Sequence, residues 1–199
     1  MRIELTLNGR PAVWEIEPGE RLLDALRRHG VYSVKRGCET GDCGACVALL
    51  DGEPVSSCVV AAARARGARV VTLEGLAGDP LLERVREAFL AEGAVQCGYC
   101  TPGMLIVAWH LLREGSKVDE VTVRQALSGS LCRCTGYVKP VRAVLLAAQR
   151  EKVIAHGHAP GGPGGPAAAP PGGGQPGAPG GQLGGQPGGP VAPAGGERP

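Results

Sequence analysis

Alternating apolar and polar positions predict short β-strands at the start of the chain. Ile3–Leu7 and Pro11–Ile16 both alternate, and the Asn8-Gly9 pair between them is typical of a two-residue hairpin turn. Glu20–Arg28 then carries leucines at helical spacing and stops before His29-Gly30, where glycine favours a helix C-terminus. The first thirty residues therefore predict a hairpin followed by one helix.

The same alternation predicts more of the sheet after a Gly-rich loop. Val47–Leu50 and Arg69–Leu73 are expected to be strands, and Asp51-Gly52 is expected to be a second hairpin turn. Together with the first hairpin, these segments predict an open sheet packed on one helix.

Beyond residue 76 the hydrophobic period becomes helical. Four segments with apolar residues three and four positions apart are separated by Gly and short polar loops. The expected helices cover Leu81–Ala91, Pro102–Arg113, Asp119–Leu127 and Val138–Lys152. This pattern predicts an α+β chain: an open-sheet domain over residues 1–76 and an all-α four-helix bundle over residues 77–155. Residues 156–199 are rich in Gly and Pro and offer little to bury, so we expect a disordered tail.

The eight cysteines fall into two sets of four. The first, called the loop quartet below, has the C-x4-C-x2-C spacing of plant-type ferredoxins, and eleven residues separate its third member from its fourth. Its members are Cys38, Cys43, Cys46 and Cys58. Glycines within the loop allow the chain to wrap tightly around a cluster. The N-terminal domain is therefore predicted to be a plant-type ferredoxin-like β-grasp that holds a [2Fe–2S] cluster.

The second set, called the helical quartet below, consists of two short sulfur pairs, C-x2-C and C-x-C. Its members are Cys97, Cys100, Cys132 and Cys134. Each pair precedes a predicted helix, with Thr101 expected to cap the first of them. Helix N-termini favour an anionic group, which predicts a second [2Fe–2S] cluster. Structural zinc is the alternative for both quartets, because four thiolates also suit Zn²⁺.

Composition narrows the possible partners and the compartment. The net charge is +2 and only 3% of residues are aromatic, which disfavours nucleic-acid binding. No apolar run is long enough to cross a bilayer, and no signal peptide is recognisable at the N-terminus. We therefore expect a cytoplasmic location. In that reducing compartment the cysteines are predicted to be ligands rather than disulfides.

Three motifs carry a resemblance to a known family. Gly41–Cys46, Gln96–Gly103 and Leu131–Tyr137, in this order, resemble the small iron–sulfur subunit of the xanthine oxidase family of molybdenum hydroxylases. The resemblance covers about residues 1–152. It implies two [2Fe–2S] clusters in this chain, a large partner subunit with a molybdenum–pterin cofactor, and a medium partner subunit with FAD.

The resemblance also implies a direction of electron flow. Electrons would pass from molybdenum to the helical quartet, then to the loop quartet and then to FAD, with Gln96 hydrogen-bonded to the pterin. No catalytic acid, base or nucleophile is predicted in this chain, so it would be the non-catalytic iron–sulfur subunit of an oxidoreductase. A free two-cluster electron carrier is the alternative. The substrate, whether CO, an aldehyde, a purine or an N-heterocycle, stays open, as do the electron acceptor and the subunit stoichiometry.

Overall fold

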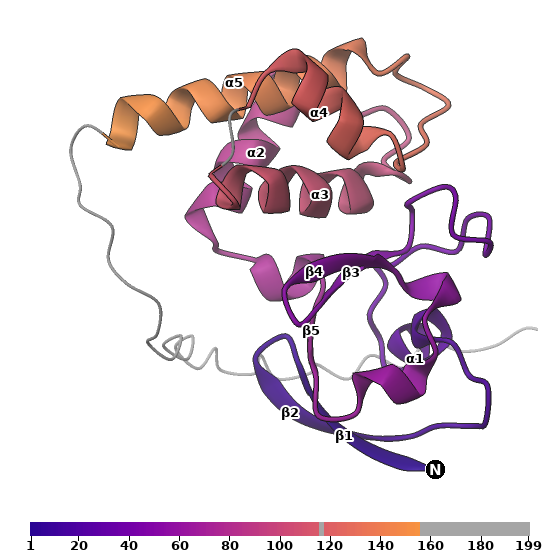
Figure 1. Cartoon of the computed structure of the whole chain (residues 1–199). Helices are drawn as coiled ribbons and strands as arrows, with labels where there is room; N and C mark the ends of the chain where they lie inside the picture. Colours follow the sequence, from indigo (N-terminus) through magenta and orange to yellow (C-terminus); the bar gives the residue numbers. More distant parts are fainter. Residues whose placement is uncertain (116–117, 156–199) are drawn as a thin grey trace, which may run out of the picture. The chain divides into compact units, whose positions relative to one another are not determined.

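A computed structural model describes residues 1–115 and 118–155 of the chain (Figure 1). The predicted tail, residues 156–199, lies outside the described residues. The N-terminal part consists of a sheet and one α-helix. Its elements are β1 (Arg2–Leu7), β2 (Arg10–Glu15), α1 (Leu22–Arg28), β3 (Val47–Leu50), β4 (Glu53–Ser56) and β5 (Arg69–Val71).

The five strands form one mixed sheet in the order β2-β1-β5-β3-β4. The β1–β2 hairpin turns at Asn8 and Gly9, which both have positive φ angles of 49° and 78°, as predicted from the sequence. β5 lies between β1, to which it is parallel, and β3, to which it is antiparallel. The fifth strand thus joins two hairpins into a single sheet.

The strand expected over 69–73 ends at Val71. Thr72 is buried, and its N–H donates to the side chain of Asn8 at 2.9 Å while its hydroxyl donates to Glu74 at 2.6 Å. These hydrogen bonds to side chains take the place of backbone bonds to a neighbouring strand. A short 3₁₀ turn, η3 (Leu73–Leu76), follows. Two other 3₁₀ turns, η1 (Ser57–Val59) and η2 (Ala62–Ala65), were also not predicted.

Four α-helices make up the second part of the chain, as predicted. They are α2 (Pro80–Ala91), α3 (Thr101–Arg113), α4 (Glu120–Leu127) and α5 (Val138–Ala155). Asp79 and Asp119 cap α2 and α4 by accepting hydrogen bonds from amides of the first turn. The expectation that Thr101 caps α3 is wrong. Thr101 is the first helical residue and Cys100 occupies the cap position without a side-chain hydrogen bond, so the helix begins one residue earlier than the sequence suggested.

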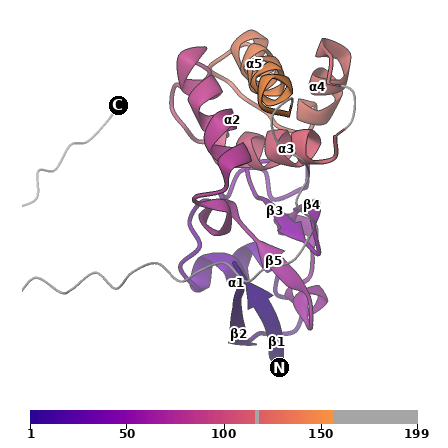
Figure 2. The same ribbon diagram turned by 90° about the vertical axis from the view of Figure 1, so that its left-hand side faces the viewer.

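Strand β3 is where the two parts of the chain pack together. The side chains of Val47 and Leu49 belong to the core of the helices, whereas Ala48 belongs to the core formed with α1. Because both faces are covered, the strand is apolar throughout, without alternation. Figure 2 shows α3 between the sheet and the other helices, and α3 contacts both β3 and β4.

The predicted α+β fold, a ferredoxin-like domain followed by a helical bundle, is confirmed by this arrangement. The expected boundary at residue 76 stays a prediction, because the core of the helices extends onto the sheet. The packing does fix the position of α3, and this helix begins directly after Cys100, the second cysteine of the helical quartet.

Candidate iron–sulfur centres

Three members of the loop quartet lie on the segment between α1 and β3, and the fourth, Cys58, lies in η1. Gly37 lies against Cys43, and a Cβ atom at residue 37 would come within 2.5 Å of the Cys43 sulfur. The N–H groups of Thr40 and Cys43 both donate to the Cys38 sulfur at 3.4 Å. The backbone thus wraps around the sulfurs, and it leaves no room for a side chain at Gly37.

Burial divides the loop quartet into two different pairs of thiols. Hydrogen bonds from Thr40 and Cys43 lower the pKa of the exposed Cys38 thiol to about 6. Burial raises the pKa of Cys58 to about 11, and the neighbouring Cys46 thiol adds to this effect. A metal ligand must be deprotonated, so metal binding at Cys58 displaces a proton that the fold alone retains.

The helical quartet is also arranged as two contacting pairs. Cys100 contacts Cys132, and burial raises the pKa of the Cys100 thiol to about 12. Cys97 contacts Cys134, both of which are exposed. Each pair joins one cysteine from the segment before α3 to one from the segment after α4, so the bundle brings the two segments together.

Three side chains tie the helical quartet together, and sequence reasoning singled out only Gln96 among them. Its amide donates to the Cys134 carbonyl at 3.1 Å and so links the two cysteine segments. The hydroxyl of Thr135 donates to the Cys132 sulfur at 3.1 Å, and the hydroxyl of Tyr137 accepts the Cys132 N–H at 2.9 Å. The sequence shows the Cys-Thr-Gly-Tyr run, but it does not show that Thr135 and Tyr137 bond to Cys132.

Pairs of sulfurs are the arrangement that a two-iron cluster needs. In a [2Fe–2S] centre with four cysteines, each iron takes two of the thiolates. Within the described ranges 1–115 and 118–155, no three His, Cys, Asp or Glu side chains converge as a single metal ion would require. The pairing therefore fits [2Fe–2S] groups better than a single zinc ion, and the N–H groups directed at sulfur and the missing Cβ at Gly37 are compatible with such groups.

Charged side chains flank the loop quartet. The Arg36 guanidinium lies 2.5 Å from Asp24 and 3.5 Å from Glu39, and Arg21 lies 2.6 Å from Glu39. Tyr99, between the first two cysteines of the helical quartet, donates its hydroxyl to the Arg36 carbonyl. These ion pairs fix the base of the loop, and the Tyr99 contact ties that base to the helical part.

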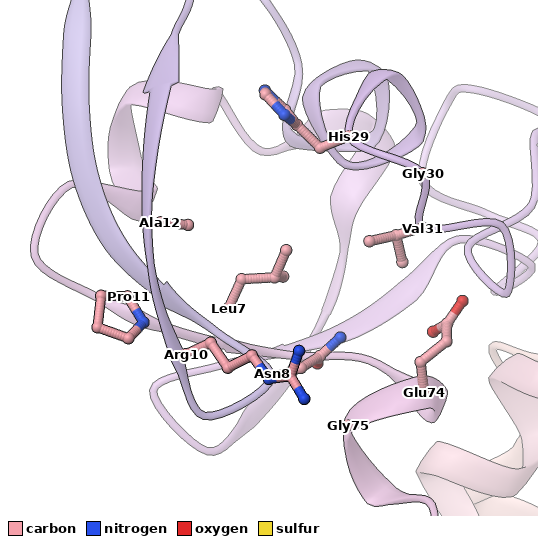
Figure 3. A pocket seen from close by; sticks show the side chains of 10 residues that line it. All are labelled: Leu7, Asn8, Arg10, Pro11, Ala12, His29, Gly30, Val31, Glu74 and Gly75. Atoms are coloured by element: carbon pink, nitrogen blue, oxygen red, sulfur yellow. The ribbon is translucent and has the colours of Figure 1, made fainter. Parts of the chain in front are cut away.

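A surface hollow of about 510 Å³ is separate from the cysteines (Figure 3). It lies between the β1–β2 hairpin, the end of α1 and the start of η3. Its ten lining residues include Arg10, His29 and Glu74 but no cysteine. The Glu74 carboxylate is occupied by hydrogen bonds from Ser33 and Thr72. The hollow therefore holds none of the predicted metal ligands.

Among the described residues, no helix combines the length and the apolar character needed to span a bilayer.

Comparison with known proteins identifies two iron–sulfur domains in the chain. Residues 5–77 match the 2Fe-2S iron-sulfur cluster binding domain, and residues 72–145 match a second family described as a [2Fe-2S] binding domain. The chain is 46% identical to the nicotinate dehydrogenase small FeS subunit of Eubacterium barkeri, over 74% of this chain and 95% of the relative. It is 45% identical to the xanthine dehydrogenase iron-sulfur-binding subunit of Escherichia coli O157:H7, over 72% and 91%.

Solved structures give the same result. A chain of quinoline 2-oxidoreductase from Pseudomonas putida 86 superposes with a TM-score of 0.71 at 41% identity, over 77% of this chain and 96% of that one. Aldehyde oxidoreductase from Desulfovibrio gigas gives a TM-score of 0.70 at 36% identity, over 77% of this chain but only 17% of its own longer chain. By sequence and by fold, the chain belongs to the family of small [2Fe–2S] subunits of xanthine oxidase-type molybdenum hydroxylases.

Proposed function

We propose that this chain is the electron-transfer subunit of a heteromeric molybdenum hydroxylase and that both cysteine quartets hold [2Fe–2S] groups. It works with a large subunit that binds molybdenum–pterin and a medium subunit that binds FAD. When bound, each cluster accepts and releases one electron at a time, which lets electrons pass between these two partners. The chain itself contributes ligands, hydrogen bonds and a fixed separation rather than a catalytic acid or base.

The arrangement of the eight sulfurs carries this proposal. Each quartet consists of two contacting pairs, as the two irons of one cluster require. Backbone N–H groups and the Thr135 hydroxyl are directed at sulfur, where they stabilise added negative charge. Two such sites in one compact chain favour a relay.

The direction of the relay follows from the family. The helical quartet receives electrons from the molybdenum side, and the loop quartet delivers them to FAD. Gln96, which is exposed and linked to Cys134, is the residue proposed to hydrogen-bond the pterin cofactor. We also propose a cytoplasmic location, because eight free thiols at ligand spacing favour a reducing compartment.

Serine substitutions test the order of the two sites in the purified complex. Cys134→Ser should stop reduction of the flavin and of the loop cluster by substrate. Cys43→Ser should leave the helical cluster reducible by substrate while the flavin stays oxidised. The substrate is chosen by screening purines, nicotinate and aldehydes for activity. Undiminished flavin reduction in both variants refutes the order, and a purified chain without molybdenum or flavin partners refutes the subunit role.

A further inference from the structure

The segments that carry the two cysteine sites contact each other through backbone atoms. The Leu131 N–H donates to the Cys43 carbonyl at 2.9 Å, so the residue before Cys132 is bonded directly to a member of the loop quartet. Next to this bond, a Cβ at Gly44 would lie 2.3 Å from the Gly129 carbonyl oxygen. From the other side, a Cβ at Gly103 would lie 2.2 Å from the Gly44 carbonyl oxygen. Three segments thus approach one another more closely than side chains would permit.

Local structure does not account for glycine at position 103. Gly103 is the third residue of α3 and has no positive φ angle. Glycine within a helix costs about 1 kcal/mol relative to alanine. The reason for its presence is therefore the Gly44 carbonyl, because a Cβ–oxygen approach of 2.2 Å is far below the 3.0 Å that real Cβ atoms respect.

A methyl group at Gly103 would have to move the cysteine loop and the start of α3 apart. Raising the distance from 2.2 Å to 3.0 Å requires a shift of at least 0.8 Å, and the atom in the way is rigid backbone rather than a flexible side chain. The displaced residue directly follows Cys43, and the displacing helix directly follows Cys100. The separation of the two quartets depends on this contact, and electron tunnelling becomes slower as the separation grows.

We propose that Gly103 and Gly44 are positioning residues for electron transfer between the two cysteine sites. Their missing side chains hold the loop quartet against the helical quartet at a fixed short separation, and the bond from Leu131 to Cys43 completes the contact. The inference rests on the proposed function, because it requires a cluster at each quartet.

Gly129 provides a matched control within the same contact. Its carbonyl faces Gly44, but a Cβ on Gly129 itself would meet no atom within 4 Å, and its φ angle is not positive. Gly129→Ala therefore adds the same methyl group to the same region without separating the loops. Leu131→Pro is a second variant, since it removes the N–H donor and places a proline Cδ against the Cys43 carbonyl, which opens the contact without changing either glycine. The side chain lost there is largely exposed.

The test uses the assembled complex with both clusters. Iron content and the two cluster signals are measured first, then the spin coupling between the reduced clusters and the rate of electron equilibration after flash photoreduction. Gly103→Ala should keep the wild-type iron content, lose much of the coupling and equilibrate severalfold more slowly. Gly129→Ala should match the wild type, and Leu131→Pro should also be slowed.

Each other outcome counts against the inference. Wild-type coupling and rate in Gly103→Ala, or an equal loss in Gly129→Ala, overturns it. If Gly103→Ala and Leu131→Pro both lose iron while Gly129→Ala retains it, the contact maintains the clusters and does not set their spacing, which also overturns it. A wild-type protein with one cluster or none overturns the proposed function instead, before any glycine variant is compared.

Discussion

Replacing Thr135 by valine should change the reduction potential of one cluster and not the other. The Thr135 hydroxyl donates to the Cys132 sulfur at 3.1 Å, and it is partly shielded from solvent. Valine has nearly the same shape but no donor. A hydrogen bond to a ligand sulfur stabilises the reduced, more negative state, so its loss should lower the potential of the helical cluster.

The expected shift follows from the strength of one hydrogen bond. A hydrogen bond to a charged acceptor such as a ligand thiolate contributes about 1.5–3 kcal/mol, and the oxidised cluster also gains part of this. We take about 1 kcal/mol as the difference between the two redox states. For a one-electron couple, about 59 mV corresponds to a tenfold change, or about 1.4 kcal/mol. The loss of this donor should therefore lower the potential by about 40 mV.

A redox titration followed by electron paramagnetic resonance measures both clusters in one sample. Thr135→Ser, which keeps the hydroxyl, is the matched control and should stay near the wild-type potential. The loop cluster is an internal control and should not shift in either variant. An unchanged or raised potential of the helical cluster in Thr135→Val would refute the argument, as would equal shifts of both clusters.

Three further predictions concern folding and cluster assembly. Asp79→Ala should lower the free energy of unfolding by about 2 kcal/mol, because one carboxylate oxygen accepts from two amides of α2 and from the buried Trp109 indole at 3.0 Å. Asp119→Ala, which removes the cap of α4, should cost about 1 kcal/mol in the same urea titration, and equal costs would contradict the indole contribution. Burial raises the pKa of Glu74, but hydrogen bonds from two hydroxyls and two backbone N–H groups lower it overall. Its carboxylate therefore stabilises the fold above the ordinary pKa of 4.5, and this stability is lost as the pH falls through the lowered pKa. Glu74→Gln should therefore show a smaller loss of stability than the wild type below about pH 4.5, measured by urea unfolding across pH, and parallel curves would count against it. Gly37→Ala should remove the loop cluster alone and leave about two irons per chain rather than about four, because its Cβ would lie 2.5 Å from a ligand sulfur. Full iron content in Gly37→Ala would show that the loop tolerates a side chain there.

The ligand candidates were evident from the sequence because their chemistry is local. Cys38, Cys43 and Cys46 lie within nine residues, so their spacing alone specifies a loop that can surround a cluster. The Asn8-Gly9 turn and the four helices were predictable for the same reason, since turn chemistry and a 3.6-residue period are properties of short segments. The family motifs then linked the two quartets.

Other parts of the site depend on residues far apart in the chain. Nothing in the sequence around Gly103 indicates that its missing Cβ makes room for Gly44, 59 positions earlier. Thr72 continues the apolar–polar pattern of a strand, yet its N–H bonds to the Asn8 side chain and β5 ends before it. Such contacts exist only after the sheet and the bundle have packed together. Residue spacing therefore could not predict them.

The central claim is that the two quartets each hold a [2Fe–2S] cluster. Its most direct test is metal and sulfide analysis of the purified chain, together with electron paramagnetic resonance of the reduced protein. We predict about four irons and about four sulfides per chain and two distinguishable [2Fe–2S] signals. A colourless protein with zinc in place of iron, or a reduced protein with only one such signal, would contradict the claim.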